Sequence, residues 1–137
     1  LPPELLRLIV KCKDNEKICL ITDSMRGADG KEGPTILGSR QEAHPAIIED
    51  GVAKLPDRSA FAGSVATTDR LFRVMVKQAG LPLEKVAAMM TRIPARIAGL
   101  EKKGSLLPGK DADFILFDGN IDVKKVFIAG KEVNFNQ

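Results

Sequence analysis

Residue types that usually hold a catalytic metal are scarce in this sequence. Its 137 residues include one histidine, His44, and two cysteines, Cys12 and Cys19. Because a protein zinc site takes about four ligands, a metal centre built on several histidines cannot be completed from this chain. Both cysteines lie in apolar stretches, which indicates small buried side chains in a reduced, cytoplasmic setting. His44 precedes a proline, and we expect it in a surface loop.

Aromatic residues and clustered positive charge are also lacking. The chain has no tryptophan or tyrosine, six phenylalanines, and a net charge of only +3, with lysine and arginine scattered along it. Nucleic-acid sites usually combine a basic stripe with aromatic stacking platforms. We therefore expect no nucleic-acid partner.

Long apolar runs are absent as well. No segment approaches the roughly 18 apolar residues that a membrane-spanning helix needs. The start of the chain, residues 1–4 (LPPE), lacks the basic and apolar blocks of a signal peptide. With 44% hydrophobic and 28% charged residues, the composition is that of a globular domain. We expect no membrane association, and the first residue, Leu rather than Met, indicates a processed or truncated piece of a longer protein.

The first half of the chain predicts a helix, a buried strand and several short strands. Leu5, Leu8, Ile9 and Cys12 recur at helical spacing behind two prolines, which a first helical turn tolerates. Residues 18–22 (ICLIT) are nearly continuously apolar, as in strands that are covered on both faces of a parallel α/β sheet. A loop is expected at 24–33. Short strands are expected at 35–37, 46–49 and 52–55, with a hairpin turn at Asp50-Gly51.

The second half predicts helices followed by a small antiparallel unit. The pattern favours a helix from Thr67 or Thr68 to about Gln78, one over 83–90 with Met89 and Met90 in the core, and a short one over 95–99. Strands are expected at 114–117, 123–128 and 132–133, with a tight turn at 129–131. This last unit differs in character from the helix-and-strand part before it.

Asp23 is the sharpest candidate for chemistry, because it directly follows the expected strand 18–22. Strand ends of parallel α/β folds carry catalytic groups, and a carboxylate there can act as a general base and acid or bind a metal. The alternative is an ordinary turn or capping aspartate.

The second candidate is the loop Phe61-Ala62-Gly63-Ser64, in which glycine allows close backbone approach and serine offers a hydroxyl. Its alternative is a simple turn before a helix.

Three blocks in the last third of the chain carry a resemblance to the amidohydrolase superfamily. Residues 103–118 (KGSLLPGKDADFILFD) resemble the signature KGxIxPGKDADLVxxD, and residues 126–133 (VFIAGKEV) follow it as in that superfamily. Residues 91–100 (TRIPARIAGL) resemble its NPAxxLGL helix. Two further blocks are similar to one family within it, the N-acetylglucosamine-6-phosphate deacetylases: residues 20–25 (LITDSM) to VTDAM, and residues 61–64 (FAGS) to LAGS. Ser24 and Phe61 depart from that pattern, which has Ala and Leu there.

The resemblance implies an enzyme that hydrolyses an amide of an amino sugar phosphate and releases acetate. In that family the aspartate matching Asp23 takes a proton from metal-bound water and then protonates the departing amine. The segment matching Phe61, Ala62, Gly63 and Ser64 lies near the sugar. The divalent metal, Zn or Fe, is held mainly by a glutamate and histidines upstream of this chain, so no metal ligand is expected here except Asp23 through bound water.

We therefore expect an α/β fold that forms the C-terminal part of a (β/α)8 metallo-dependent hydrolase barrel and part of a small β-sandwich. Residues 1–33 and 56–100 are assigned to the barrel, 34–55 to a β-hairpin insertion, and 101–137 to the sandwich. The full-length enzyme is expected to be a cytoplasmic homodimer, and this chain alone to be inactive. Two alternatives stay open: another amidohydrolase, dihydroorotase-like or an amino-acid deacetylase, and a non-catalytic assembly module of the same scaffold.

Overall fold

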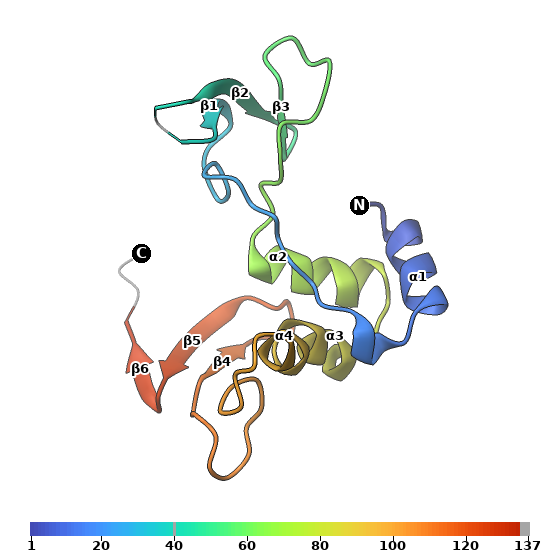
Figure 1. Ribbon diagram of the computed structural model, residues 1–137, viewed down its shortest axis with the longest axis vertical. Coiled ribbons are helices and arrows are strands. Elements are labelled where there is room, and N and C mark those ends of the chain that lie inside the picture. The colour runs from blue at the N-terminus through green and yellow to red at the C-terminus, as the bar shows by residue number, and fades with distance from the viewer. Residues whose placement is uncertain (40, 135–137) are drawn as a thin grey trace. The chain divides into compact units, whose positions relative to one another are not determined.

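The computed structural model describes residues 1–39 and 41–134 of a mixed α/β chain (Figure 1). Its helices are α1 (Pro3–Cys12), the 3-10 turn η1 (Asn15–Lys17), α2 (Thr68–Arg73), the π-helical η2 (Val74–Gln78), α3 (Leu83–Met90) and α4 (Arg92–Ile97). Its strands are β1 (Gly33–Leu37), β2 (His44–Glu49), β3 (Val52–Lys54), β4 (Phe114–Phe117), β5 (Val123–Ile128) and β6 (Lys131–Val133). None of the described helices is long and apolar enough to cross a membrane.

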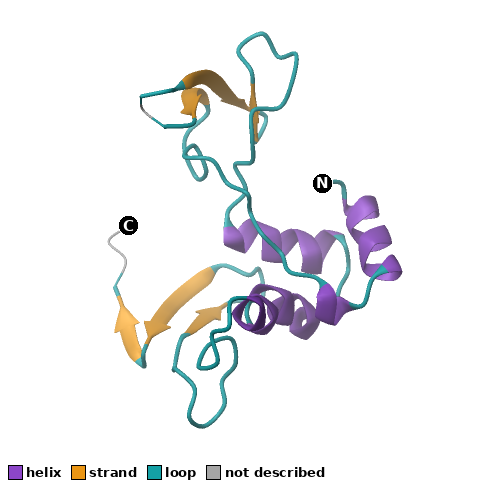
Figure 2. Cartoon of the chain, in the orientation of Figure 1, coloured by secondary structure: helices purple, strands orange, loops and turns teal. Residues whose placement is uncertain are grey.

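The chain forms two compact units, one of residues 1–20 with 72–137 and one of residues 21–71. Each unit holds one three-stranded antiparallel sheet, β1-β2-β3 in residues 21–71 and β4-β5-β6 in the other (Figure 2). The predicted division into barrel, insertion and sandwich parts remains a prediction.

The helical core lies in the unit of residues 1–20 and 72–137. Val86 and Met89, one turn apart on α3, are fully buried together with Ile93 of α4, and Met75 of η2 is buried against them. The predicted helix over 83–90 and the core position of Met89 are confirmed. Burying each of these side chains stabilises the unit by about 1.5–3 kcal/mol relative to leaving it exposed.

Two helices differ in detail from the sequence prediction. The helix predicted to run to about Gln78 does so, but its last turn is π-helical, with the Ala79 N–H donating to the Val74 carbonyl at 2.9 Å. The short helix predicted at 95–99 begins earlier, at Arg92. Pro94 therefore lies inside its first turn, where proline costs nothing because that N–H has no partner within a helix.

The packed face of α1 also differs from the prediction. Leu6 and Val10 contact the helical core, whereas the predicted face of Leu5, Leu8 and Ile9 is exposed. Cys12 continues that exposed face, so the prediction that it is buried was wrong. Both apolar faces of α1 satisfy helical periodicity, and the spacing alone does not decide which one packs.

The predicted buried strand at residues 18–22 is not formed. This segment has no ladder partner among the described residues. Its backbone bonds to other elements are from the Ile18 N–H to the Asn15 carbonyl of η1, at 3.2 Å, and from the Leu20 N–H to the Met89 carbonyl of α3, at 3.1 Å. Ile21 is 74% exposed. A strand requires a neighbour that accepts and donates in register, and an apolar sequence cannot supply that neighbour by itself.

The sheet of residues 21–71 confirms the predicted hairpin. β2 pairs with β3 around Asp50 and Gly51, whose φ angles of 55° and 68° are those of a type I′ turn. β1 pairs with the other edge of β2, from Gly33 opposite Ile48 to Leu37 opposite His44. His44 is exposed as predicted, although it begins a strand rather than lying in a loop.

The second sheet closes against the helices through an aromatic contact. The rings of Phe72 and Phe117 are 5.6 Å apart, and Phe114 stacks on Phe127 at 4.4 Å. The predicted turn between β5 and β6 is confirmed, with left-handed Ala129 and Gly130. Its Ala129 N–H donates to the Asp113 carboxylate at 2.8 Å, which lowers the pKa of that carboxyl together with Lys103.

Two glycines of the turn-rich segment before β4 provide a matched test of packing. Gly104 and Gly109 both have φ of +84°, but a Cβ on Gly104 would lie 2.8 Å from the Thr91 oxygen and 2.9 Å from the Ala95 Cβ, whereas Gly109 faces open space. Alanine at either position costs about 1–2 kcal/mol of backbone strain. We expect Gly104→Ala to cost about 1–3 kcal/mol more than Gly109→Ala, because backbone must move. Urea unfolding of both variants measures this difference. Equal losses of unfolding free energy in the two variants would contradict the close packing around Gly104.

Candidate active site

Asp23 lies in a tight left-handed turn at the start of the unit of residues 21–71. Its φ is 49°, a conformation that residues with a Cβ adopt rarely and mostly where the surrounding structure requires it. The Ser24 N–H donates to the Thr22 hydroxyl at 3.3 Å, which closes a turn around Asp23. Asp23 is exposed, and within residues 1–39 and 41–134 its carboxylate has no hydrogen-bond or ion-pair partner.

The structure brings the Asp23 turn and the Phe61–Ser64 segment together. Ser24 and Ser64 form a parallel β-bridge, in which the Met25 N–H donates to the Ser64 carbonyl at 2.9 Å. The Ser24 hydroxyl also donates to the carbonyl of Ala66. Two candidate segments about forty positions apart in sequence are thus adjacent in space, although neither motif predicts that contact.

The four residues of the Phe61–Ser64 segment have different environments. Phe61 is 78% exposed, while Ala62 is buried with Ala46 and Ala53 and donates its N–H to the Ala53 carbonyl at 2.8 Å. Gly63 has φ of 120°, which glycine adopts without strain. The Ser64 hydroxyl accepts the Ala66 N–H at 3.1 Å. The buried alanine anchors the segment, and the exposed phenylalanine next to it is available for contact with a ligand.

A charged cluster holds the loop that leads into this segment. Arg58 donates to both oxygens of Glu49 at 3.0 and 3.1 Å, and Lys54 donates to Glu49 at 3.2 Å and to Asp50 at 2.9 Å. The bonds from Arg58, and then from Lys54, lower the pKa of Glu49 from 4.5 to about 2. This bidentate geometry ties the loop 56–60 to the β2–β3 hairpin.

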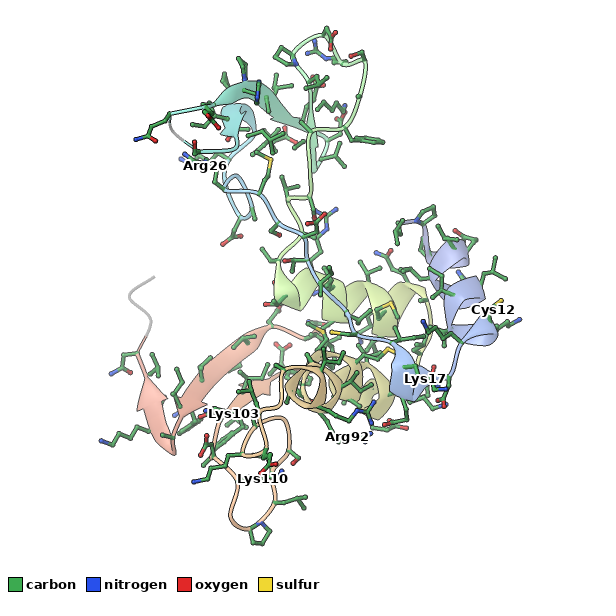
Figure 3. The ribbon with its side chains drawn as sticks, in the orientation of Figure 1. Cys12, Lys17, Arg26, Arg92, Lys103 and Lys110 are labelled. Carbon is green, nitrogen blue, oxygen red and sulfur yellow. The ribbon has the colours of Figure 1, made fainter. Side chains whose placement is uncertain are left out.

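The loop that follows Asp23 is fixed to the same sheet. Gly27 is buried, and a Cβ there would lie 2.6 Å from the Cδ1 methyl of Ile48, so that side chain would have to move. The Arg26 guanidinium, labelled in Figure 3, donates to the Gly38 carbonyl at 2.9 Å. This bond holds the Arg26 side chain near the end of β1.

Neither unit contains an evident metal centre among the described residues. No group of three or more His, Cys, Asp and Glu side chains is close enough to hold an ion there. A hollow of about 720 Å³ lies in the unit of residues 1–20 and 72–137, lined largely by apolar groups including Pro94, Leu106 and Phe114. It contains none of the predicted site residues. The described side chains therefore do not by themselves form a site for a divalent metal.

Sequence reasoning missed the two hydroxyls that flank Asp23. Thr22 falls in the predicted strand 18–22, and Ser24 stands out in the sequence only as a departure from the family pattern, but both hydroxyls make hydrogen bonds that shape the Asp23 turn. The available signal was the Thr-Asp-Ser order itself, because hydroxyl side chains commonly bond backbone groups two residues away. Nothing in the sequence indicated the pairing of Ser24 with Ala66.

Comparison with known proteins agrees with the sequence resemblance. The model of the amidohydrolase family matches residues 1–133. The chain is 36% identical to an N-acetylglucosamine-6-phosphate deacetylase of Caenorhabditis elegans over 85% of this chain and 27% of that one, and 31% identical to an N-acetylgalactosamine-6-phosphate deacetylase of Escherichia coli O157:H7 over 90% and 32%.

A solved structure extends this likeness to the backbone. An N-acetyl-D-glucosamine-6-phosphate deacetylase mutant from Mycobacterium smegmatis, in complex with N-acetyl-D-glucosamine-6-phosphate, matches 96% of this chain and 34% of its own, with a TM-score of 0.79 and 29% identity. The chain thus spans about a third or less of each of these three relatives. It belongs to the amidohydrolase family and is related to its amino sugar phosphate deacetylases.

The Glu49 cluster predicts a pH-dependent contribution to stability. Because the pKa of Glu49 is lowered in the folded state, its contribution is present above about pH 4.5 and is lost as the pH falls toward about 2. Glu49→Gln should therefore lower the urea midpoint at pH 7, and the difference from wild type should shrink below pH 4.5. Glu32→Gln, at an exposed position in the same unit, is the control. A difference for Glu49→Gln that stays constant down to pH 3 would contradict the assigned ion pairs.

Proposed function

We propose that this chain is part of an enzyme that hydrolyses the acetamide of N-acetylglucosamine 6-phosphate to glucosamine 6-phosphate and acetate. The observation that carries the proposal is the pairing of the Asp23 turn with the segment that ends at Ser64. This pairing joins the turn that carries the exposed Asp23 carboxylate to the segment that carries the exposed Phe61 side chain. Membership in the amidohydrolase family and the deacetylase names of its relatives support the same reaction.

Asp23 has the properties that the reaction requires of one group. Amide hydrolysis needs a base that removes a proton from the attacking water and an acid that delivers a proton to the departing nitrogen. A single carboxylate can do both in turn, provided that it reaches both atoms. The Asp23 carboxylate is exposed and has no partner in the described part of the chain, so it is available for that exchange.

The remaining parts of the enzyme would lie outside this chain. We propose that these residues form the C-terminal part of a (β/α)8 barrel and of a small β-sandwich in a cytoplasmic homodimer. A divalent metal, Zn or Fe, would be held by residues of the preceding segment. Large exposed apolar side chains, such as Leu8 on α1 and Ile97 on α4, support a chain that packs against the rest of a longer protein.

A second substrate has a specific observation in its favour. One relative is named for N-acetylgalactosamine 6-phosphate and shares 31% identity over 90% of this chain. The two sugars differ only in the orientation of one hydroxyl group, so the same acetamide chemistry serves both. Turnover of both sugar phosphates by the full-length protein, compared as kcat/KM, decides between them.

The role of Asp23 can be tested in the full-length protein. Asp23→Asn removes the base and acid but retains the shape of the side chain. We expect kcat for acetate release from N-acetylglucosamine 6-phosphate to fall by about 10³-fold or more, with unchanged thermal unfolding. Asp29→Asn, at an exposed aspartate of the following loop, is the matched control and should retain wild-type turnover.

Three results would separate the possible readings. An active wild type with an equally active Asp23→Asn variant would leave Asp23 as a turn residue and overturn its catalytic role. Wild-type turnover of dihydroorotate or an N-acetyl amino acid, but not of the sugar phosphates, would replace the proposed substrate class. Absence of any hydrolysis by the metal-supplemented full-length protein would favour an assembly module.

The 137-residue chain alone should be inactive. Its described residues offer no cluster of side chains that could bind a catalytic ion. Asp23 without a bound ion should therefore accelerate amide hydrolysis very little. We expect acetate release at the background rate with Zn²⁺ or Fe²⁺ added, measured beside the full-length protein. Turnover by the purified chain above that background would show that it carries a complete site.

A further inference from the structure

The Asp23 backbone needs support from its neighbours. Its φ of 49° lies in the left-handed region, which is disfavoured for residues with a Cβ, although less for Asp and Asn, whose side chains can bond locally. Conformations of this kind persist where neighbouring interactions fix them, and they concentrate at functional sites. Because the Asp23 carboxylate has no side-chain partner in the described part of the chain, its position is determined by its own backbone.

Two hydroxyls supply the bonds that fix this backbone. The Thr22 hydroxyl accepts the Ser24 N–H at 3.3 Å, and the bond spans Asp23. The Ser24 hydroxyl donates to the Ala66 carbonyl, beyond the end of the Phe61–Ser64 segment. Together with the bond from the Met25 N–H to the Ser64 carbonyl, they hold the turn on both sides of Asp23.

We propose that Thr22 and Ser24 are positioning residues for Asp23. Thr22 sets the left-handed turn, and Ser24 fixes that turn relative to the Phe61–Ser64 segment. The distance between Asp23 and that segment is thereby held constant. This inference rests on the proposed function, in which Asp23 exchanges protons with water and the leaving nitrogen. A shift of about 1 Å in such a group can cost about 10²-fold in rate.

A positioning role differs measurably from a purely structural one. If the hydroxyls only stabilise the unit, their loss lowers the melting temperature and the amount of folded enzyme, and turnover per folded molecule stays constant. If they position Asp23, kcat per folded molecule falls while KM changes little, because the substrate still binds. Restoring a hydroxyl at the same position should restore kcat.

The test uses the full-length enzyme with N-acetylglucosamine 6-phosphate as substrate. Thr22→Val removes the acceptor but keeps the branched shape, and Ser24→Ala removes the donor. We expect kcat to fall about tenfold or more for Thr22→Val and about threefold to tenfold for Ser24→Ala, with KM within about twofold. Thr22→Ser and Ser24→Thr keep the hydroxyl and should stay within about twofold of wild type. Ser59→Ala is the control, because that hydroxyl bonds only to the Asp57 carboxylate in the described structure.

Several results would overturn the positioning role of Thr22 and Ser24. Wild-type kcat in both Thr22→Val and Ser24→Ala, beside an inactive Asp23→Asn, would overturn the positioning role and leave the proposed function standing. A fall in kcat that merely follows the folded fraction, or one that the hydroxyl-retaining variants do not reverse, would also overturn it. A wild-type enzyme that hydrolyses neither sugar phosphate would overturn both proposals together.

Discussion

The contact on which the candidate site depends is the hydrogen bond from the Met25 N–H to the Ser64 carbonyl. It joins two segments that are far apart in sequence and that belong to no regular sheet. One such bond contributes only about 0.5–1.5 kcal/mol net. The contact therefore needs the bonds around it, from Ser24 to Ala66 and from Ala62 to Ala53, to keep the two segments in register.

Small side chains make this arrangement possible. Ala46, Ala53 and Ala62 form the buried cluster beneath the Phe61–Ser64 segment, and Gly63 passes beside Met25 with no Cβ of its own. Larger side chains in place of these buried alanines would push the hairpin and the segment apart. The ion pairs of Glu49 act at the other end of the same loop, where they hold Arg58 against β2. The geometry of the Asp23 turn thus depends on packing within β2 and β3.

Local patterns predicted most of the elements, and long-range partners account for the failures. The Asp50-Gly51 hairpin and helix α3 were predictable because turn chemistry and apolar spacing act over a few residues. Residues 18–22 read as a strand because they are apolar, yet a strand exists only with a partner in register. Cys12 was misplaced for a related reason, since the core contacts Leu6 and Val10 instead. Sequence motifs predicted the candidate residues of the site. No local sequence pattern predicted the hydrogen bond from Met25 to Ser64 that joins their segments.

We propose that the Asp23 turn and the Phe61–Ser64 segment form one substrate site. The most direct test is a crystal structure of the full-length Asp23→Asn variant with N-acetylglucosamine 6-phosphate bound, since that variant should hold the substrate without hydrolysing it. We expect the acetamide next to residue 23 and the sugar ring against Phe61 and its neighbours. A sugar phosphate bound elsewhere, with its acetamide away from residue 23, would show that the two segments do not form the substrate site.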